Sequence, residues 1–328
     1  MNKNELTVAM LGPSGVGKTA LLAVVSRALG QTANLTDLVL KAEVEGQAKL
    51  DDHYQLLEEL VKSFSTSGNS VWKGTITPQD YIFELQRKGG FLRERRESLS
   101  IKFIDVPGGN LLMRDKRDDY VDVVSKSGAT IIVVDTIALM HSRGKFNEQR
   151  NLVKEVMQLV KEAYDKSANE SKLLIFVPIK CETYLRGGKD PQDIHESLKS
   201  AYDDLLRGYL LPKALNIAVV VTPVKTVGCV VYNSNTIDKN GRIDWKLKKT
   251  SEDDLMEPAY VEEPIRFLLR FLFCQFLNRQ NSSIFGAFNN FLGRNEDLKE
   301  AVKKFADVRT GIDVPIEILQ GHHLLNLK

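Results

Sequence analysis

A glycine-rich segment near the N-terminus restricts the fold of this chain more than any other feature. Residues 12–19 read Gly-Pro-Ser-Gly-Val-Gly-Lys-Thr, which is the pattern Gly-x-x-x-x-Gly-Lys-Thr. The apolar run Leu6–Leu11 before it predicts a buried strand, and Gly17–Leu29 after it predicts a helix. A strand, a glycine-rich loop and a helix in this order form a phosphate-binding loop, because backbone N–H groups and the helix N-terminus then face the same anion. We therefore expect this loop to bind a nucleoside triphosphate.

The residue types in this loop match the chemistry of a phosphate chain bound with Mg²⁺. Glycine permits backbone conformations that turn amide groups towards phosphate oxygens. The Lys18 amine is expected to reach the β- and γ-phosphates, and the Thr19 hydroxyl is expected to bind Mg²⁺. The candidate nucleotide-binding residues of the loop are Gly12, Ser14, Gly15, Val16, Gly17, Lys18, Thr19 and Ala20.

Apolar runs and amphipathic stretches alternate along much of the chain. After the first strand and helix, the expected strands are 130–134, 172–177 and 217–221, and the expected helices are 146–166, 191–207 and 263–279. Residues 81–86 alternate apolar and polar side chains and 99–104 form a second such run, so 81–104 predicts an antiparallel hairpin. Strands that alternate with helices predict an α/β fold, with a mostly parallel sheet and helices on both faces.

Two stretches interrupt this alternation. Residues 1–280 are expected to form one nucleotide-binding domain, with an insertion at 30–74 that includes a helix near 51–64. A second, irregular insertion is expected at 225–260, where the sequence is polar. Residues 281–328 are expected to form a C-terminal extension that is less core-like, and they are a candidate partner-binding segment.

Composition excludes several classes of protein. The net charge is +2, from 45 basic and 43 acidic residues, so no nucleic-acid partner held by bulk charge is expected. Cys181, Cys229 and Cys274 are an odd number at wide spacing, which fits neither a disulfide framework nor a zinc site. The most apolar stretches, 129–140 and 267–277, are too short to span a membrane. A cytoplasmic location without a targeting peptide is therefore expected.

A second motif, Asp105-Val106-Pro107-Gly108, follows the strand at 99–104. An aspartate at the carboxyl end of a buried strand points into the crevice where open α/β sheets bind ligands. Asp105 is therefore a candidate to hold Mg²⁺ through a water molecule, and the Gly108 amide is a candidate to meet the γ-phosphate. The alternative is an ordinary turn at the end of a strand.

With these two motifs, most of residues 5–225 resembles the Ras-like GTPases of the TRAFAC class. The antiparallel hairpin beside a parallel sheet is similar to that family as well. The resemblance implies that a threonine just before the hairpin also binds Mg²⁺. This chain offers Thr75 and Thr77, and Thr77 is favoured because it lies four residues before Tyr81, where the strand begins.

The resemblance also places the residues that recognise the base. The family carries an Asn/Thr-Lys-x-Asp motif at the position of Ile179-Lys180-Cys181-Glu182. A carboxylate at Glu182 suits guanine, which presents donors at N1 and N2, whereas adenine presents an acceptor at N1. Lys180 is expected to lay its aliphatic stem along the base. In the segment Thr222–Lys225, the backbone amide of Val224 is expected to meet the guanine oxygen.

One residue of the family pattern is missing from this chain. Ras-like enzymes usually carry a glutamine directly after the Asp-x-x-Gly motif to orient the attacking water, and this chain has Gly109 followed by Asn110. Lys18, Thr77 and Gly108 remain as the candidate catalytic residues. We therefore expect slow intrinsic GTP hydrolysis, with a partner protein or a second protomer supplying the missing group.

A long insertion before Thr75 and a late Glu-Glu-Pro-Ile at 262–265 are similar to the bacterial double-GTPase type of conflict and defence loci. This resemblance implies a switch that acts within a protein complex, in antiviral defence. Two alternatives stay open. One is an ATPase or nucleotide-dependent kinase that uses the phosphate-binding loop without Glu182, and the other is a pseudo-GTPase scaffold that holds its nucleotide without cleaving it.

Overall fold

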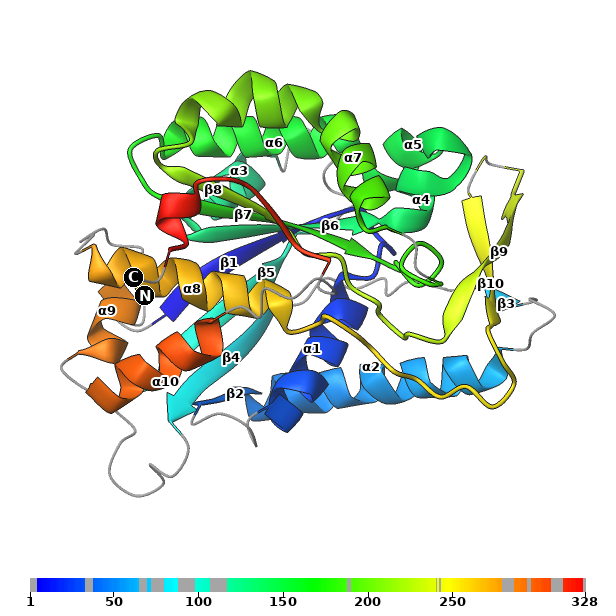
Figure 1. The fold of residues 1–328 in the computed structure, drawn as a ribbon, viewed down its shortest axis with the longest axis horizontal. Helices are drawn as coiled ribbons and strands as arrows, with labels where there is room; N and C mark the ends of the chain where they lie inside the picture. The colour runs from blue at the N-terminus through cyan, green and yellow to red at the C-terminus, as the bar shows by residue number, and fades with distance from the viewer. Residues whose placement is uncertain are drawn as a thin grey trace.

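The computed structural model has an α/β architecture with one large central sheet between two layers of helices (Figure 1). The residues that the structure describes are 5–32, 38–64, 70–71, 80–87, 98–106, 117–187, 190–239, 241, 243–278, 286–293, 296–307 and 315–326. None of the helices in these ranges is long and apolar enough to cross a membrane.

The central sheet has eight strands and is mostly parallel. In spatial order they are β11 (Glu317–Gln320), β8 (Ile217–Val221), β7 (Lys172–Ile179), β6 (Ala129–Asp135), β1 (Glu5–Leu11), β5 (Leu99–Asp105), β4 (Asp80–Arg87) and β2 (Leu38–Ala42). Neighbouring strands from β8 to β5 are parallel. The pairs β5–β4, β4–β2 and β8–β11 are antiparallel. The predicted mostly parallel sheet is confirmed, and so is the predicted antiparallel pairing of 81–86 with 99–104; the predicted connection between these two strands lies outside the described residues.

Helices cover both faces of this sheet, as predicted (Figure 1). One layer contains α1 (Lys18–Thr32), α2 (Val44–Ser63), α8 (Glu263–Leu277), α9 (Gly286–Leu292) and α10 (Glu296–Ala306). The other contains α3 (Arg117–Lys126), α6 (Val153–Lys166), α7 (Gln192–Ala201) and a π-helical segment at Asp204–Leu210. Side chains of β1 alternate between the layers, with Met10 in the first core and Leu11 in the second, because successive strand residues point to opposite faces.

The helix predicted at 146–166 is divided in two. A short helix α4 (Thr136–Met140) and a 3₁₀ turn at His141–Gly144 come before α5 (Asn147–Asn151), and α6 begins at Val153. Between α5 and α6, Leu152 has a left-handed backbone with φ of 49°. Asn151 explains the break, because its side-chain amide accepts from the backbone N–H of Asp135 at 2.8 Å and donates to the Asp135 carbonyl at 3.2 Å. The helix is thus tied to the end of β6.

The insertion predicted to be irregular at 225–260 contains regular structure. β9 (Val230–Ile237) and β10 (Ile243–Lys249) form an antiparallel hairpin, and β3 (Ser70–Val71) adds a third strand to it. This small sheet packs its inner face on α4, with Trp245 and Leu247 buried beside Ile137. The insertion is therefore folded onto the carboxyl ends of the parallel strands and does not project away from them.

The C-terminal segment contributes to the core over its described parts. Phe288 and Phe291 of α9 and Val302 and Phe305 of α10 are buried in the same cluster as α8. β11 then pairs with β8 at the edge of the sheet, followed by a short 3₁₀ turn at His322–Leu324. A role in partner binding for residues 281–328 remains a prediction.

Candidate functional site

The glycine-rich loop at 12–19 lies where the order of strands in the sheet reverses. β1 has β5 on one side and β6 on the other, although β5 and β6 follow each other in the chain. Ligands of open α/β sheets bind outside the carboxyl ends of the strands at such a point. β1 ends at Leu11 and α1 begins at Lys18, so the loop occupies this position.

The backbone of the loop requires its glycines. Gly12, Gly15 and Gly17 have φ of 149°, 74° and 120°, a region that other residues rarely adopt. At Gly17 space is limited as well, because an added Cβ would lie 2.7 Å from the Cδ1 atom of Ile179. The loop therefore contacts the residue that directly precedes Lys180, which connects the phosphate end of the candidate site to its base end.

Lys18 and Asp105 meet beneath the loop. The Lys18 Nζ atom lies 3.2 Å from Asp105 Oδ1 and donates to the Gly12 carbonyl at 2.6 Å. Strand register brings them together, since Asp105 pairs with Met10 in the β1–β5 ladder. Burial lowers the pKa of Lys18 and raises the pKa of Asp105, and the attraction between the two charges offsets each shift only in part. The structure thus brings together two residues that the sequence predicts to share a site.

The oxygen atoms at this point suit Mg²⁺. Apart from the ion pair with Lys18, the buried Oδ1 atom of Asp105 has no hydrogen-bond partner among the residues that the structure describes. Thr19, which is next to Lys18 at the start of α1, is 7% exposed. A carboxylate and a hydroxyl are hard oxygen ligands of the kind that Mg²⁺ takes beside substrate phosphates. The other predicted residues of this half of the site, Thr75, Thr77, Gly108 and Gly109, lie outside the described residues.

The residues predicted at the base end are also brought together. Val224 donates its backbone N–H to the Pro178 carbonyl at 2.8 Å and accepts from the Cys181 N–H at 3.4 Å. The segments that follow β7 and β8 therefore run side by side. Lys180, the first residue after β7, has a left-handed φ of 59°.

Glu182 is turned towards the small sheet. Its Oε1 atom accepts from the backbone N–H of Val227 at 2.8 Å and of Gly228 at 3.2 Å. Burial raises the pKa of this carboxyl group, and the backbone hydrogen bonds lower it by less. Together with Lys180 and Tyr232, Glu182 lines a cavity of about 10 Å³, which is roughly the room that one water molecule needs. In this conformation the carboxylate has no space for a base, so its predicted role requires the side chain to turn outwards.

The amine of Lys180 pairs with a buried carboxylate, Asp135, that was not predicted to belong to the site. Its Nζ atom lies 2.7 Å from Asp135 Oδ2, and Asp135 is fully buried at the carboxyl end of β6. The same oxygen accepts from the Trp245 indole at 3.0 Å and lies 3.7 Å from the Arg150 guanidinium. Burial alone would raise the pKa of Asp135, but Lys180, Arg150 and the hydrogen bonds outweigh it and hold the pKa below its usual range. Asp135 is therefore an anion at neutral pH.

A local signal for Asp135 was present in the sequence. Like Asp105, it follows a buried apolar strand directly, and such a position faces the ligand crevice. Arg150 and Trp245 carry no comparable signal. They reach Asp135 from α5 and β10, and β10 belongs to a sheet that the polar sequence of 225–260 did not predict.

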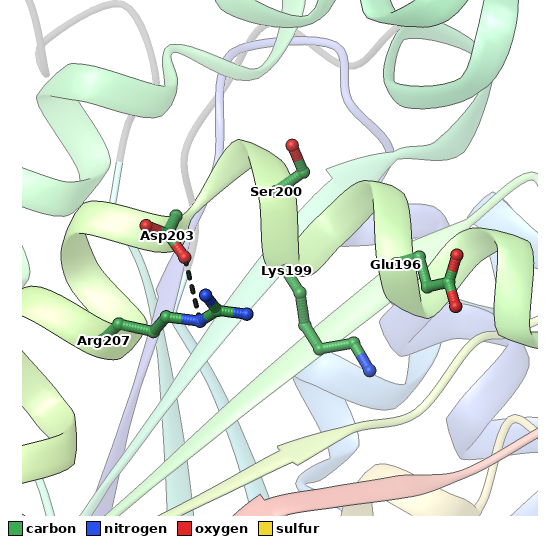
Figure 2. A pocket seen from close by; sticks show the side chains of 5 residues that line it. All are labelled: Glu196, Lys199, Ser200, Asp203 and Arg207. Carbon is green, nitrogen blue, oxygen red and sulfur yellow. Dashed lines mark ion pairs between the residues drawn. The ribbon is translucent and has the colours of Figure 1, made fainter.

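A surface depression on the helical layer lies apart from these residues. Figure 2 shows its lining, which comes from α7 and the π-helical segment after it: Glu196, Lys199, Ser200, Asp203 and Arg207. Arg207 Nε and Asp203 Oδ1 lie 3.1 Å apart, with the two side chains 78% and 57% exposed. Exposed ion pairs of this kind stabilise little, and this face is an ordinary solvated helix surface.

Comparison of the chain with models of known protein families gave no match, and no curated protein matches it either.

Proposed function

We propose that this chain binds a nucleoside triphosphate together with Mg²⁺, prefers GTP, and hydrolyses it slowly as a Ras-like molecular switch. The observation that carries the proposal is the Lys18–Asp105 pair beneath the glycine-rich loop, with its 3.2 Å contact at the point where the strand order reverses. A loop with this sequence, backbone and position suits a phosphate chain.

Each residue at the phosphate end has a task in this proposal. The loop amides and Lys18 neutralise phosphate oxygens, and Lys18 exchanges its contacts with the Gly12 carbonyl and Asp105 for contacts with the phosphates. Thr19 and Asp105 hold Mg²⁺, with Thr77 as a further proposed ligand. When bound, the metal supplies positive charge against the charge that develops on the phosphates.

The preference for GTP is supported by the residues gathered after β7 and β8. Glu182 supplies a carboxylate and Lys180 an aliphatic stem. The Val224 amide, which the sequence predicts to meet the guanine oxygen, is already donated to the Pro178 carbonyl at 2.8 Å and is not free for that role in this conformation. To meet guanine, Glu182 has to release the amides of Val227 and Gly228. Because burial raises the pKa of this carboxyl group, outward rotation into a more solvated position favours its charged form.

The inward position of Glu182 also favours a second candidate function, in which the protein binds a nucleotide without recognising its base. If Glu182 serves only to cap the backbone at 227–228, the site holds a phosphate chain without reading the base. The protein is then a nucleotide-binding ATPase, kinase or scaffold of the same loop class.

Measured affinities for GTP, GDP and ATP separate these candidates. We expect GTP and GDP to bind the wild type at least about tenfold more tightly than ATP, because a carboxylate pairs with two guanine donors. Glu182→Ala should remove this preference and leave ATP affinity unchanged. Equal affinities for GTP and ATP in the wild type, unaffected by Glu182→Ala, would support the second candidate.

Hydrolysis by the isolated chain is expected to be slow. Gly109 stands where a glutamine would orient the attacking water, and glycine has no side chain for this task. Single-turnover GTP hydrolysis should proceed at about 10⁻⁴ to 10⁻² s⁻¹, the range of unassisted switches. A rate well above about 1 s⁻¹ would contradict this part of the proposal.

The missing group is proposed to come from a partner protein or a second protomer. If a second protomer supplies it, the rate per molecule should rise with protein concentration. If a different partner supplies it, the rate should stay constant until that partner is added. The wider proposal, a switch within a complex of a bacterial defence system, is supported by the family resemblance of the sequence.

A further inference from the structure

Three donors from three different elements converge on one carboxylate oxygen. Asp135 Oδ2 lies 2.7 Å from Lys180 Nζ, 3.0 Å from Trp245 Nε1 and 3.7 Å from Arg150. Lys180 follows β7, and Trp245 lies in β10 of the small sheet. The other oxygen, Oδ1, accepts from the backbone N–H of Ala138 at 3.1 Å, which fixes the orientation of the carboxylate.

The backbone around this carboxylate is held in conformations that ordinary residues avoid. Lys180 has φ of 59° and Leu152, next to Asn151, has φ of 49°. Residues other than glycine adopt this left-handed backbone region at a cost in free energy, so the surrounding contacts must hold the backbone there. Asn151 and Thr226 supply such contacts, since Asn151 bonds the Asp135 backbone and Thr226 Oγ1 accepts from the Lys180 N–H at 3.4 Å.

We infer that Trp245 is a positioning residue for nucleoside binding: through Asp135 it sets the place of the Lys180 side chain, and so couples the small sheet to the base end of the site. The inference rests on the proposed function, since it assigns Lys180 to the nucleoside. Once its amine is fixed on Asp135, the stem of Lys180 is already ordered when a base arrives, and ordering a long side chain beforehand strengthens binding.

The indole N–H can be separated from the packing of its ring. The Trp245 ring contacts Phe146 edge-on at 5.7 Å between centroids, contacts Tyr232 at 5.9 Å, and lies 5.7 Å from the Arg150 guanidinium. Trp245→Phe keeps an aromatic ring at this place and removes only the donor to Asp135. A loss caused by this variant therefore reports the hydrogen bond more than the core.

The first test compares GTP with inorganic tripolyphosphate, which engages the loop at 12–19 but offers no base. Isothermal titration with Mg²⁺ should show that Trp245→Phe weakens GTP binding about threefold to tenfold. This is less than the full effect of a hydrogen bond to a charged group, because the lost bond acts on the nucleoside only through Asp135 and Lys180. Tripolyphosphate affinity should stay unchanged. An equal loss for both ligands, or no loss of GTP affinity, would overturn the inference.

A second readout does not depend on the stability of that variant. The chain has two tryptophans, and Trp72→Phe leaves Trp245 as the sole tryptophan. Saturating GDP should change the emission of Trp245, and saturating tripolyphosphate should leave it as it is. If saturating GDP leaves the Trp245 emission unchanged, the coupling is contradicted.

Failure of the inference and failure of the proposed function give different results. A wild-type protein that binds neither GTP nor tripolyphosphate would overturn both. A wild type that binds both ligands, with Trp245→Phe indistinguishable from it, would overturn the positioning role alone.

Discussion

At the scale of single residues, the candidate site is a group of buried charges. Lys18, Asp105, Asp135 and Glu182 are nearly or fully withdrawn from water, and within the described part of the chain the first three have a charged partner and Glu182 has none. A buried ion pair contributes little net stability, whereas a buried charge without a partner is costly. The hydrogen bonds that the structure shows for the Glu182 carboxylate come from backbone amides, so Glu182 carries the clearest consequence for pH dependence.

Glu182→Gln tests that consequence. A carboxyl group whose pKa is raised by folding binds more protons in the native state, so its unfavourable effect is absent below its usual pKa of 4.5 and grows as pH rises through the folded value. Glutamine keeps an acceptor for Val227 and Gly228 without the charge. The free energy of unfolding should therefore fall more between pH 4.5 and 7 in the wild type than in the variant. Urea titrations of both proteins at the two pH values measure this difference, and parallel pH profiles would contradict it.

At the scale of elements, the apolar runs and their spacing predicted most of the sheet. β1, β4, β5, β6, β7 and β8 begin and end within about two residues of the predicted strands. Buried parallel strands are continuous apolar runs, and the antiparallel β4 shows the alternation of apolar and polar residues that marks a half-buried strand. The break at Leu152 was not predictable from periodicity, since it depends on Asn151 reaching the end of β6. β9 and β10 were not predicted, because the sequence of a strand with one polar face, within a polar segment, has the pattern of a loop.

The edge strand β11 also depends on contacts that are distant in sequence. Its Gln320 side chain donates to the carbonyls of Leu210 and Ile217 at 3.1 and 3.0 Å. Glu317 lies 2.7 Å from His195 Nδ1 and 2.9 Å from Lys199 Nζ, both on α7. These contacts tie the C-terminal segment to the sheet, although the strand itself is only four residues long.

A pair of glycines tests how tightly β11 is held. Gly321, directly after β11, has φ of 72°, and an added Cβ would lie 2.6 Å from the Ala218 Cα atom of β8. Gly241, in the turn of the small sheet, has φ of 75° with nothing within 4 Å of such a Cβ. Gly241→Ala should cost about 1 kcal/mol for its left-handed backbone, and Gly321→Ala about 3 kcal/mol or more because backbone atoms must also move. Equal losses of unfolding free energy in denaturant titrations would show that β11 is loosely docked.

At the scale of the whole molecule, the fold brings distant segments to one edge of the sheet. The glycine-rich loop at 12–19, Asp105, and the segments after β7 and β8 all lie at carboxyl ends of parallel strands, which is why motif order along the chain predicted their proximity. The Lys18–Asp105 contact follows from that logic, because adjacent parallel strands end side by side. The orientation of Glu182 and the contact of Trp245 with Asp135 depend on the small sheet, so motif order along the chain did not predict them.

The central claim is that the loop at 12–19 binds a nucleoside triphosphate with Mg²⁺ through Lys18. Isothermal titration of GTP in excess Mg²⁺ into the wild type and into Lys18→Ala, both shown to be folded by circular dichroism, tests it most directly. We predict saturable one-to-one binding to the wild type and an affinity about a hundredfold lower or more in the variant, because two charge-assisted hydrogen bonds to phosphate are lost. Equal binding by the two proteins, or no binding by the wild type at millimolar nucleotide, would contradict the claim.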